Sequence, residues 1–181
     1  GKDKAATEAV VGVLRPGDKP KLLARVALSL TGQSYRMPPL FHGEDKNRSV
    51  RIERMDLGEA LPVIALYDVA EEVTDGFEHT VETLHLLRFT PRGQAADEDD
   101  LSEILTLQVN ESQGDPECSG DSTSVELKPS SSKTQGLRDL AVVTRTFKST
   151  LTMKRKDMIC VPHRTKERST YRFDSKSYKV Y

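Results

Sequence analysis

Residues 62–91 read PVIALYDVAEEVTDGFEHTVETLHLLRFTP, and this stretch decides the fold. Asp75 and Gly76 at its centre form the pair that a type I′ turn prefers, because both central residues of that turn need a positive φ. Apolar and β-branched residues flank the pair on both sides, so the stretch predicts one long β-hairpin. With Asp75 and Gly76 as the two loop residues, Ile64 lies opposite Leu87.

The two-residue period of a strand divides the apolar residues of this hairpin between two faces. One face carries Ile64, Leu66, Ala70, Val81, Leu87 and Phe89, and the other carries Val63, Ala65, Tyr67, Val69, Leu84 and Leu86. The base of the hairpin is therefore apolar on both faces, which predicts a strand pair in the middle of the fold. A bulge near Thr83 would shift this phase.

Further strands are predicted from alternating or β-branched runs at residues 8–14, 21–31, 49–57, 101–109, 125–127, 137–154, 158–161 and 170–181. In the third of these runs, Val50 and Ile52 are expected to face inward and Arg51 and Glu53 outward. The 18-residue alternation at 137–154 is long for a single strand, so a bend or bulge is expected within it. The apolar face predicted for that strand consists of Leu137, Ala141, Val143, Phe147, Leu151 and Met153.

About eight to ten strands without a competing helical period predict an all-β fold. The expected architecture is an antiparallel β-sandwich or jelly roll with few or no helices. At 181 residues the chain suits a single β-rich domain over residues 1–181. A short N-terminal arm (1–7) and flexible loops at 92–100 and 110–136 are predicted from their small and polar residues.

The two cysteines, Cys118 and Cys160, do not by themselves imply a disulfide framework. A reducing compartment, cytoplasm or nucleus, is therefore predicted, and secretion stays open. No apolar run approaches the roughly 20 residues of a membrane-spanning helix. Asn47 and Asn110 lie in N-x-S sequons, for which glycosylation and coincidence both remain open.

Charge is distributed unevenly along a chain whose formal net charge is only −1. Residues 91–126 hold ten acidic residues and one basic residue, whereas residues 144–181 hold eleven basic and three acidic. Such a basic region is a candidate binding site for nucleic acid or anionic lipid, with interleaved aromatic residues available for stacking. The alternatives are a solvated face, or pairing with the acidic segment of the same chain or of a neighbour. The basic set is Arg145, Lys148, Lys154, Arg155, Lys156, Arg164, Lys166, Arg168, Arg172, Lys176 and Lys179.

His79 and His85 share one face of the hairpin, with Glu72 opposite His79 and Asp68 diagonal to His85. Such a group could bind a metal or transfer protons. Its spacing matches no known ligand pattern, so cross-strand ion pairs on a polar hairpin tip are the favoured interpretation.

Other catalytic signals are weak. Cys160 lies three positions before His163 but within an apolar run, so an inert buried thiol is predicted. There is no nucleophile elbow, glycine-rich phosphate loop or C-x-x-C pair. We therefore expect no enzyme, no cofactor, and no catalytic or metal site.

The predicted loop at 32–47 contains Pro38, Pro39, Leu40 and Phe41. It is either pinned to the core by Phe41, which is the favoured reading, or a proline-rich docking segment for a protein partner.

Three functional hypotheses follow. The leading one is a non-enzymatic structural or assembly protein that forms homo-oligomers and binds RNA or an anionic membrane through the basic C-terminal region, as viral matrix and capsid proteins do as a class. The second is a cellular protein–protein interaction module. The third is a small hydrolase or metal enzyme that uses the histidines of the hairpin. No small-molecule substrate is evident.

Overall fold

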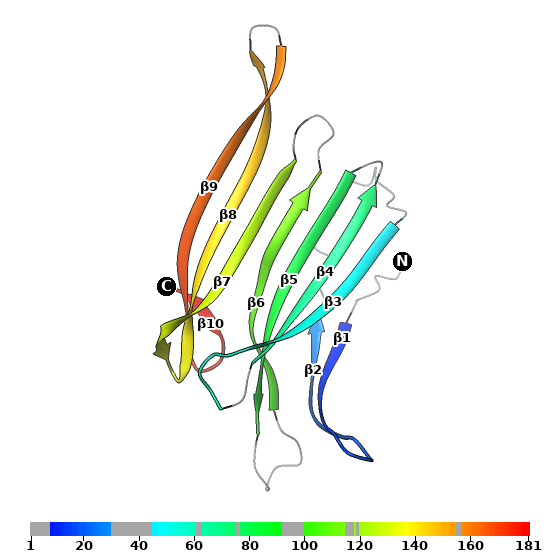
Figure 1. Ribbon diagram of the computed structural model, residues 1–181, viewed down its shortest axis with the longest axis vertical. Coiled ribbons are helices and arrows are strands. Elements are labelled where there is room, and N and C mark those ends of the chain that lie inside the picture. The colour runs from blue at the N-terminus through cyan, green and yellow to red at the C-terminus, as the bar shows by residue number, and fades with distance from the viewer. Residues whose placement is uncertain are drawn as a thin grey trace, which may run out of the picture.

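A computed structural model describes residues 8–29, 45–60, 63–74, 77–91, 100–114, 118, 120–154 and 157–181 (Figure 1). Within these residues the protein consists of strands and turns, which confirms the all-β prediction. The described part of the chain contains no helix long and apolar enough to cross a membrane. The strands are β1 (Glu8–Arg15), β2 (Lys21–Ser29), β3 (Asp45–Met55), β4 (Val63–Thr74), β5 (Phe77–Thr90), β6 (Asp100–Gln113), β7 (Asp121–Thr134), β8 (Leu137–Lys154), β9 (Asp157–Phe173) and β10 (Tyr178–Val180).

The strands form two antiparallel sheets. The large sheet has the order β10-β9-β8-β7-β6-β5-β4-β3, so each of its strands pairs with its neighbours in sequence. The small sheet is the hairpin β1–β2, which lies beside the lower half of the large sheet in Figure 1. Two packed layers give the sandwich-like arrangement that the strand pattern predicts.

The hairpin β4–β5 has the predicted register along its whole length. Ile64 pairs with Leu87, and the pairing continues without interruption to Thr74 and Phe77. The bulge anticipated near Thr83 exists, but it lies between β5 and β6 rather than within the hairpin. The phase of the two hairpin faces is therefore as predicted.

Both faces of β4–β5 are buried, each in a different core. The larger core takes Val63, Ala65, Leu84 and Leu86 from this hairpin and joins them to residues of the other strands and of the β3–β4 connection. These other residues are Leu57, Ile104, Leu105, Val109, Leu137, Leu140, Val142, Phe173 and Tyr178. The second core takes Leu66 and Leu87 from the opposite face and packs them against Ala24 and Leu28 of β2 and Leu101 of β6. The hairpin is thus the central element of the fold.

Two contacts attach the β3–β4 connection and the last strand to the start of β8. The backbone N–H of Arg138 donates to the carbonyl oxygen of Leu57 at 2.9 Å. The hydroxyl of Tyr178 donates to the carbonyl oxygen of Arg138 at 2.6 Å. Elements at the two edges of the large sheet therefore meet at one residue, which closes the lower end of the larger core.

The predicted flexible loop at 110–136 is wrong for most of its length. Residues 121–134 form β7, although the sequence PSSSKT within it is polar and carries a proline. This strand forms because β8 pairs with it along most of its length and β6 pairs with its first four residues, so that tertiary pairing outweighs weak strand propensity. The predicted arm at 1–7 and residues 92–99 of the other loop lie outside the described residues.

Strand β8 has the predicted bounds, but the expected irregularity lies in its neighbour. The register between β7 and β8 shifts between Pro129 and Lys133, whereas β8 pairs with β9 continuously from Leu140 to Lys154. Leu140 and Val142 face the core, while Met153 is 72% exposed. Leu137 of the predicted apolar face is buried, but beyond it the buried apolar residues Leu140 and Val142 lie at even positions, so the predicted phase is wrong over most of the strand.

Two further predictions about side-chain burial are wrong. Val50 and Ile52 of β3 were expected to face inward, and they are 50% and 62% exposed. The short buried strand predicted at 158–161 is instead the start of the 17-residue β9, and Met158 is 58% exposed. Both cases concern strands at or near an edge of the sheet, where apolar residues lack a covering layer.

Candidate functional site

Five basic side chains gather on one face of β8 and β9, here called the basic face. Arg164, Lys166, Arg168 and Arg172 alternate along β9, so their side chains point to the same side of the strand. Arg145 of β8 lies directly opposite Lys166 and joins them on that side. Residues on alternate positions of a strand are about 7 Å apart, so the cations form a row along the sheet. All five residues are exposed.

Few acidic groups compensate the charge of the basic face. Glu126 of β7 lies 3.0 Å from the guanidinium of Arg145 and 2.5 Å from Lys128 Nζ. Hydrogen bonds from Lys128 and Arg145 lower the pKa of Glu126, so this carboxylate stays ionised. Lys166 and Arg168 have no ion-pair partner among the described residues. The middle of the row therefore carries uncompensated positive charge.

Aromatic rings support the two ends of the row. The guanidinium of Arg164 lies 5.6 Å from the ring centre of Phe147, and that of Arg172 lies 5.1 Å from the ring centre of Tyr181. Such cation–π contacts hold a guanidinium in place without neutralising it. Arg172 Nε also lies 3.9 Å from the buried carboxylate of Asp139.

The other predicted basic residues are placed differently. Lys148 lies on the opposite face of β8, across from His163, and so does not belong to the basic face. Lys179 of β10 pairs with Arg172 and extends the row at its lower end. Lys176 lies in the turn between β9 and β10. The side chains of Lys154, Arg155 and Lys156 lie outside the described part of the structure.

The far end of the β8–β9 hairpin is apolar and exposed. Leu151, Met153 and Met158 are 37%, 72% and 58% exposed, and we call these three residues the apolar tip. Met153 pairs with Met158, and Leu151 with Cys160, so the alternation places the apolar tip on the same side of the hairpin as the basic face. The hairpin projects beyond the neighbouring strands at the top of Figure 1. The apolar tip therefore lies at an extremity of the molecule.

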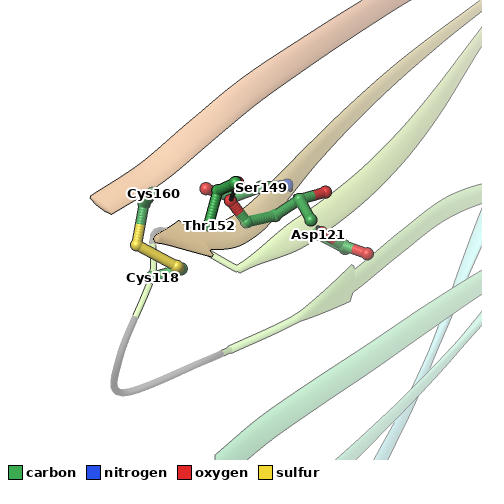
Figure 2. Close-up of a disulfide and its surroundings, with 6 residues drawn as sticks. Cys118, Asp121, Ser149, Thr152 and Cys160 are labelled. Atoms are coloured by element: carbon green, nitrogen blue, oxygen red, sulfur yellow. Dashed lines mark hydrogen bonds between the residues drawn. A yellow bond between two sulfur atoms is a disulfide. The ribbon is translucent and has the colours of Figure 1, made fainter. Parts of the chain in front are cut away.

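A disulfide anchors this hairpin to the rest of the sheet. Cys118, in the connection between β6 and β7, is bonded to Cys160 of β9 (Figure 2). Close by, the backbone N–H of Ser149 donates to a carboxylate oxygen of Asp121 at 2.9 Å. The prediction that Cys160 is an inert free thiol is therefore wrong. Cys160 and His163 also differ in parity along β9 and point to opposite faces, so they form no thiol–imidazole pair.

The two histidines of β5 each lie against a carboxylate of the neighbouring strand β6. His79 Nε2 lies 3.5 Å from Glu111 Oε1, and His85 Nδ1 lies 2.6 Å from Glu103 Oε1. The hydrogen bond to His85 lowers the pKa of Glu103. The backbone register places Glu72 opposite His79, as predicted, but the side chain of Glu72 lies outside the described part of the structure. The carboxylates of Glu103 and Glu111 were not predicted as partners, because the sequence does not show that β6 lies next to β5.

His85 does not belong to a polar tip, as the sequence had suggested. Its side chain is 1% exposed, and Asp68 and Thr83 beside it are equally buried. The described residues contain no group of three or more histidine, cysteine or acidic side chains placed to hold a metal ion. The geometry provides a buried imidazole held by a carboxylate, Glu103, whose side chain is partly exposed.

The predicted docking segment Pro38–Phe41 lies outside the described residues. Comparisons of the chain with models of protein families, with curated proteins and with solved structures found no match.

Sequence reasoning located the basic residues but missed the apolar tip and the disulfide. The apolar tip has a signal in the sequence, since Met153 and Met158 flank the basic turn symmetrically. The pairing of Cys118 with Cys160 has no comparable signal, because a separation of 42 residues does not indicate proximity.

Proposed function

We propose that the protein is a non-enzymatic structural protein that attaches to anionic membrane surfaces through the β8–β9 hairpin. The observation that carries this proposal is the presence of exposed apolar side chains and uncompensated cations on one side of one projecting hairpin. Binding at a lipid interface uses both kinds of side chain, because apolar groups enter the headgroup region and basic groups attract anionic lipids. Each Lys or Arg close to such a surface contributes about 1 kcal/mol.

Two features favour lipid over nucleic acid as the anionic partner. A phosphate backbone would use the cations of the basic face but would leave the apolar tip in water. The ring of Phe147, which is the aromatic group on the basic face of β8, already lies against Arg164 and offers less surface for stacking on a base.

The disulfide supports an oxidising compartment rather than the cytoplasm or nucleus. Disulfides form and persist in extracellular and periplasmic environments and are rare where thiols are kept reduced. We propose that the protein works in such a compartment, where membrane surfaces are the common extended anions.

Co-sedimentation with vesicles tests the proposal. Wild-type protein is expected to bind phosphatidylcholine vesicles that contain 30% phosphatidylglycerol and to bind pure phosphatidylcholine much more weakly. Replacing Arg164, Lys166 and Arg168 by Glu should weaken binding at least about 100-fold, since three attractive contributions of about 1 kcal/mol become repulsive. The Met153→Ser, Met158→Ser double variant should retain the salt-dependent part of binding and lose the part that persists at high salt.

A matched control comes from the β1–β2 hairpin. Lys19, Lys21 and Arg25 are exposed, and replacing them by Glu changes the net charge by the same amount far from the basic face. This control should bind like the wild type. Equal loss of binding in both triple variants would show that net charge alone drives attachment and would contradict the proposal. Tight binding of single-stranded RNA at physiological salt, together with no binding to the anionic vesicles, would favour the nucleic-acid hypothesis instead.

A further inference from the structure

Strand β3 forms one edge of the large sheet and carries an apolar pattern that the single chain does not bury. Among the described residues, β4 is the strand that pairs with it, and its outer edge has no strand partner. Val50 and Ile52 have the alternation of a buried strand yet are 50% and 62% exposed. An open edge with exposed apolar side chains is a template for pairing with another strand.

We propose that a second copy of this chain covers the edge, through antiparallel pairing of β3 with its own symmetry mate about a two-fold axis at Ile52. Closed two-fold symmetry is the commonest form of self-association, and it requires a self-complementary surface. The segment Arg51-Ile52-Glu53 is self-complementary in this sense. A two-fold axis at Ile52 places each Ile52 opposite the other and each Arg51 opposite Glu53 of the second copy.

Charge selects this register over its neighbours. An axis at Arg51 would place the two Arg51 side chains opposite each other, and an axis at Glu53 would do the same with two carboxylates. Like charges directly opposite in a sheet are destabilising. An axis at Val50 would place Arg51 opposite Ser49 and would leave Glu53 without a cation. Among axes centred within residues 50–53, the one at Ile52 is therefore the register that pairs unlike charges twice.

The side chains of the self-complementary segment are already oriented. The guanidinium of Arg51 lies 3.9 Å from the ring centre of Tyr67 and 3.1 Å from a carboxylate oxygen of Glu82. Arg51 also forms an ion pair with Glu53, two residues along the same face. Each Glu53 would thus lie between two guanidinium groups in the dimer, its own and that of the second copy. Pairing therefore costs little additional conformational entropy of the Arg51 and Glu53 side chains, which favours association.

This inference goes beyond the proposed membrane attachment and does not depend on it. Strand β3 and the β8–β9 hairpin lie at opposite sides of the large sheet, separated by β4 to β7. Variants of one site therefore leave the other unchanged.

Sedimentation velocity over a range of protein concentrations measures the association. Wild type should shift with concentration toward twice the chain mass of 20.2 kDa. Ile52→Lys and Glu53→Arg should remain monomeric at concentrations where the wild type is dimeric. Arg51→Glu alone should also be monomeric, but an equimolar mixture of Arg51→Glu and Glu53→Arg should regain the dimer, because unlike charges then face each other in the mixed pair. A wild type that stays monomeric at every concentration would overturn the proposal.

Single cysteines test the register directly. Directly opposite residues have Cβ atoms about 4.5–5.5 Å apart, close to the separation in a disulfide. Ile52→Cys should therefore form a covalent dimer under mild oxidation, visible on a non-reducing gel. Val50→Cys is the matched control, since the two Val50 positions would be four residues apart along the strands, about 13 Å. Equal cross-linking of both variants, or none of Ile52→Cys in a protein that dimerises, would reject the two-fold axis at Ile52.

Discussion

Tyr178 joins the last strand to the core through its hydroxyl group. The ring is buried with Phe173 in the larger core, at 5.6 Å between ring centres. The hydroxyl donates to the carbonyl oxygen of Arg138, whose N–H is already bonded to Leu57. Removing this one oxygen atom leaves a partly buried carbonyl without the donor that the Tyr178 side chain supplies.

Tyr178→Phe is therefore expected to lower the free energy of unfolding by about 1 to 3 kcal/mol, the cost of an unsatisfied buried polar group. Urea denaturation followed by circular dichroism measures the change. Tyr181→Phe is the control, because Tyr181 is 69% exposed and its loss of a hydroxyl should have little effect. A Tyr178 variant as stable as this control would show that water replaces the lost donor.

The same residue should affect stability at alkaline pH. Burial, with the nearby charges of Asp139 and Glu59, raises the pKa of Tyr178 well above its usual value of 10.0. In the unfolded chain the phenol loses its proton near pH 10, while the folded protein still holds it. The unfolded state then binds fewer protons, so stability falls as pH rises above about 10. Tyr178→Phe should make this fall less steep, which denaturation at pH 8 and pH 11 measures.

Single residues also mark the limits of prediction from sequence. Strand β8 has apolar residues at both even and odd positions, so alternation alone did not decide which set is buried. The odd set looked stronger because it includes Leu151 and Met153, which turn out to lie beyond the covered part of the sheet. Burial of a strand residue depends on which other element packs over it, and the sequence of the strand alone does not show which element that is.

At the scale of elements, the residues of a turn predicted strand pairing better than the composition of a segment predicted whether it is a strand. The pair at Asp75 and Gly76 gave the whole register of β4–β5, because a two-residue turn fixes which residues lie opposite each other. Strand β7 had no such signal, and only its residues 125–127 were predicted as a strand, since its other residues are polar and resemble a loop. The basic residues of β9 were found, but their grouping on one face needed the register with β8.

The disulfide is expected to stabilise the hairpin of β8 and β9 substantially. It closes a chain segment of 42 residues, for which the loss of unfolded-state entropy predicts about 4 kcal/mol. A double variant with Ser at Cys118 and Cys160 should be less stable by an amount of this order in urea denaturation.

Added reductant should lower the stability of the wild type and leave that of the double variant unchanged. If the wild type proves equally stable with and without reductant, the bond either does not form or constrains segments already fixed in the unfolded chain.

At the scale of the whole molecule, the two cores share the β4–β5 hairpin but need not have equal stability. The second core is smaller and attaches the β1–β2 layer largely through Ala24 and Leu28. Leu28→Ala removes a fully buried side chain, a change that costs about 2–5 kcal/mol. Because this loss of stability falls on one small layer, β1–β2 should detach and unfold before the large sheet unfolds.

Hydrogen exchange measures this difference. In Leu28→Ala, amides of β1 and β2 should exchange much faster, while those of β4 to β8 keep the protection of the wild type. Leu84→Ala, on the opposite face of the hairpin, should instead increase exchange throughout the large sheet. Uniform acceleration in both variants would show that the two layers unfold as one unit.

The sequential order of the large sheet has a consequence for the speed of folding. Every strand from β3 to β10 pairs with the strand next to it in the chain, so sheet contacts join residues that are close in sequence. Loop closure then costs little entropy at each step, and a fold of low relative contact order forms faster than a Greek key of the same size. The β4–β5 hairpin, paired up to Thr74 and Phe77, is the natural nucleus, from which pairing can spread outward one strand at a time in both directions.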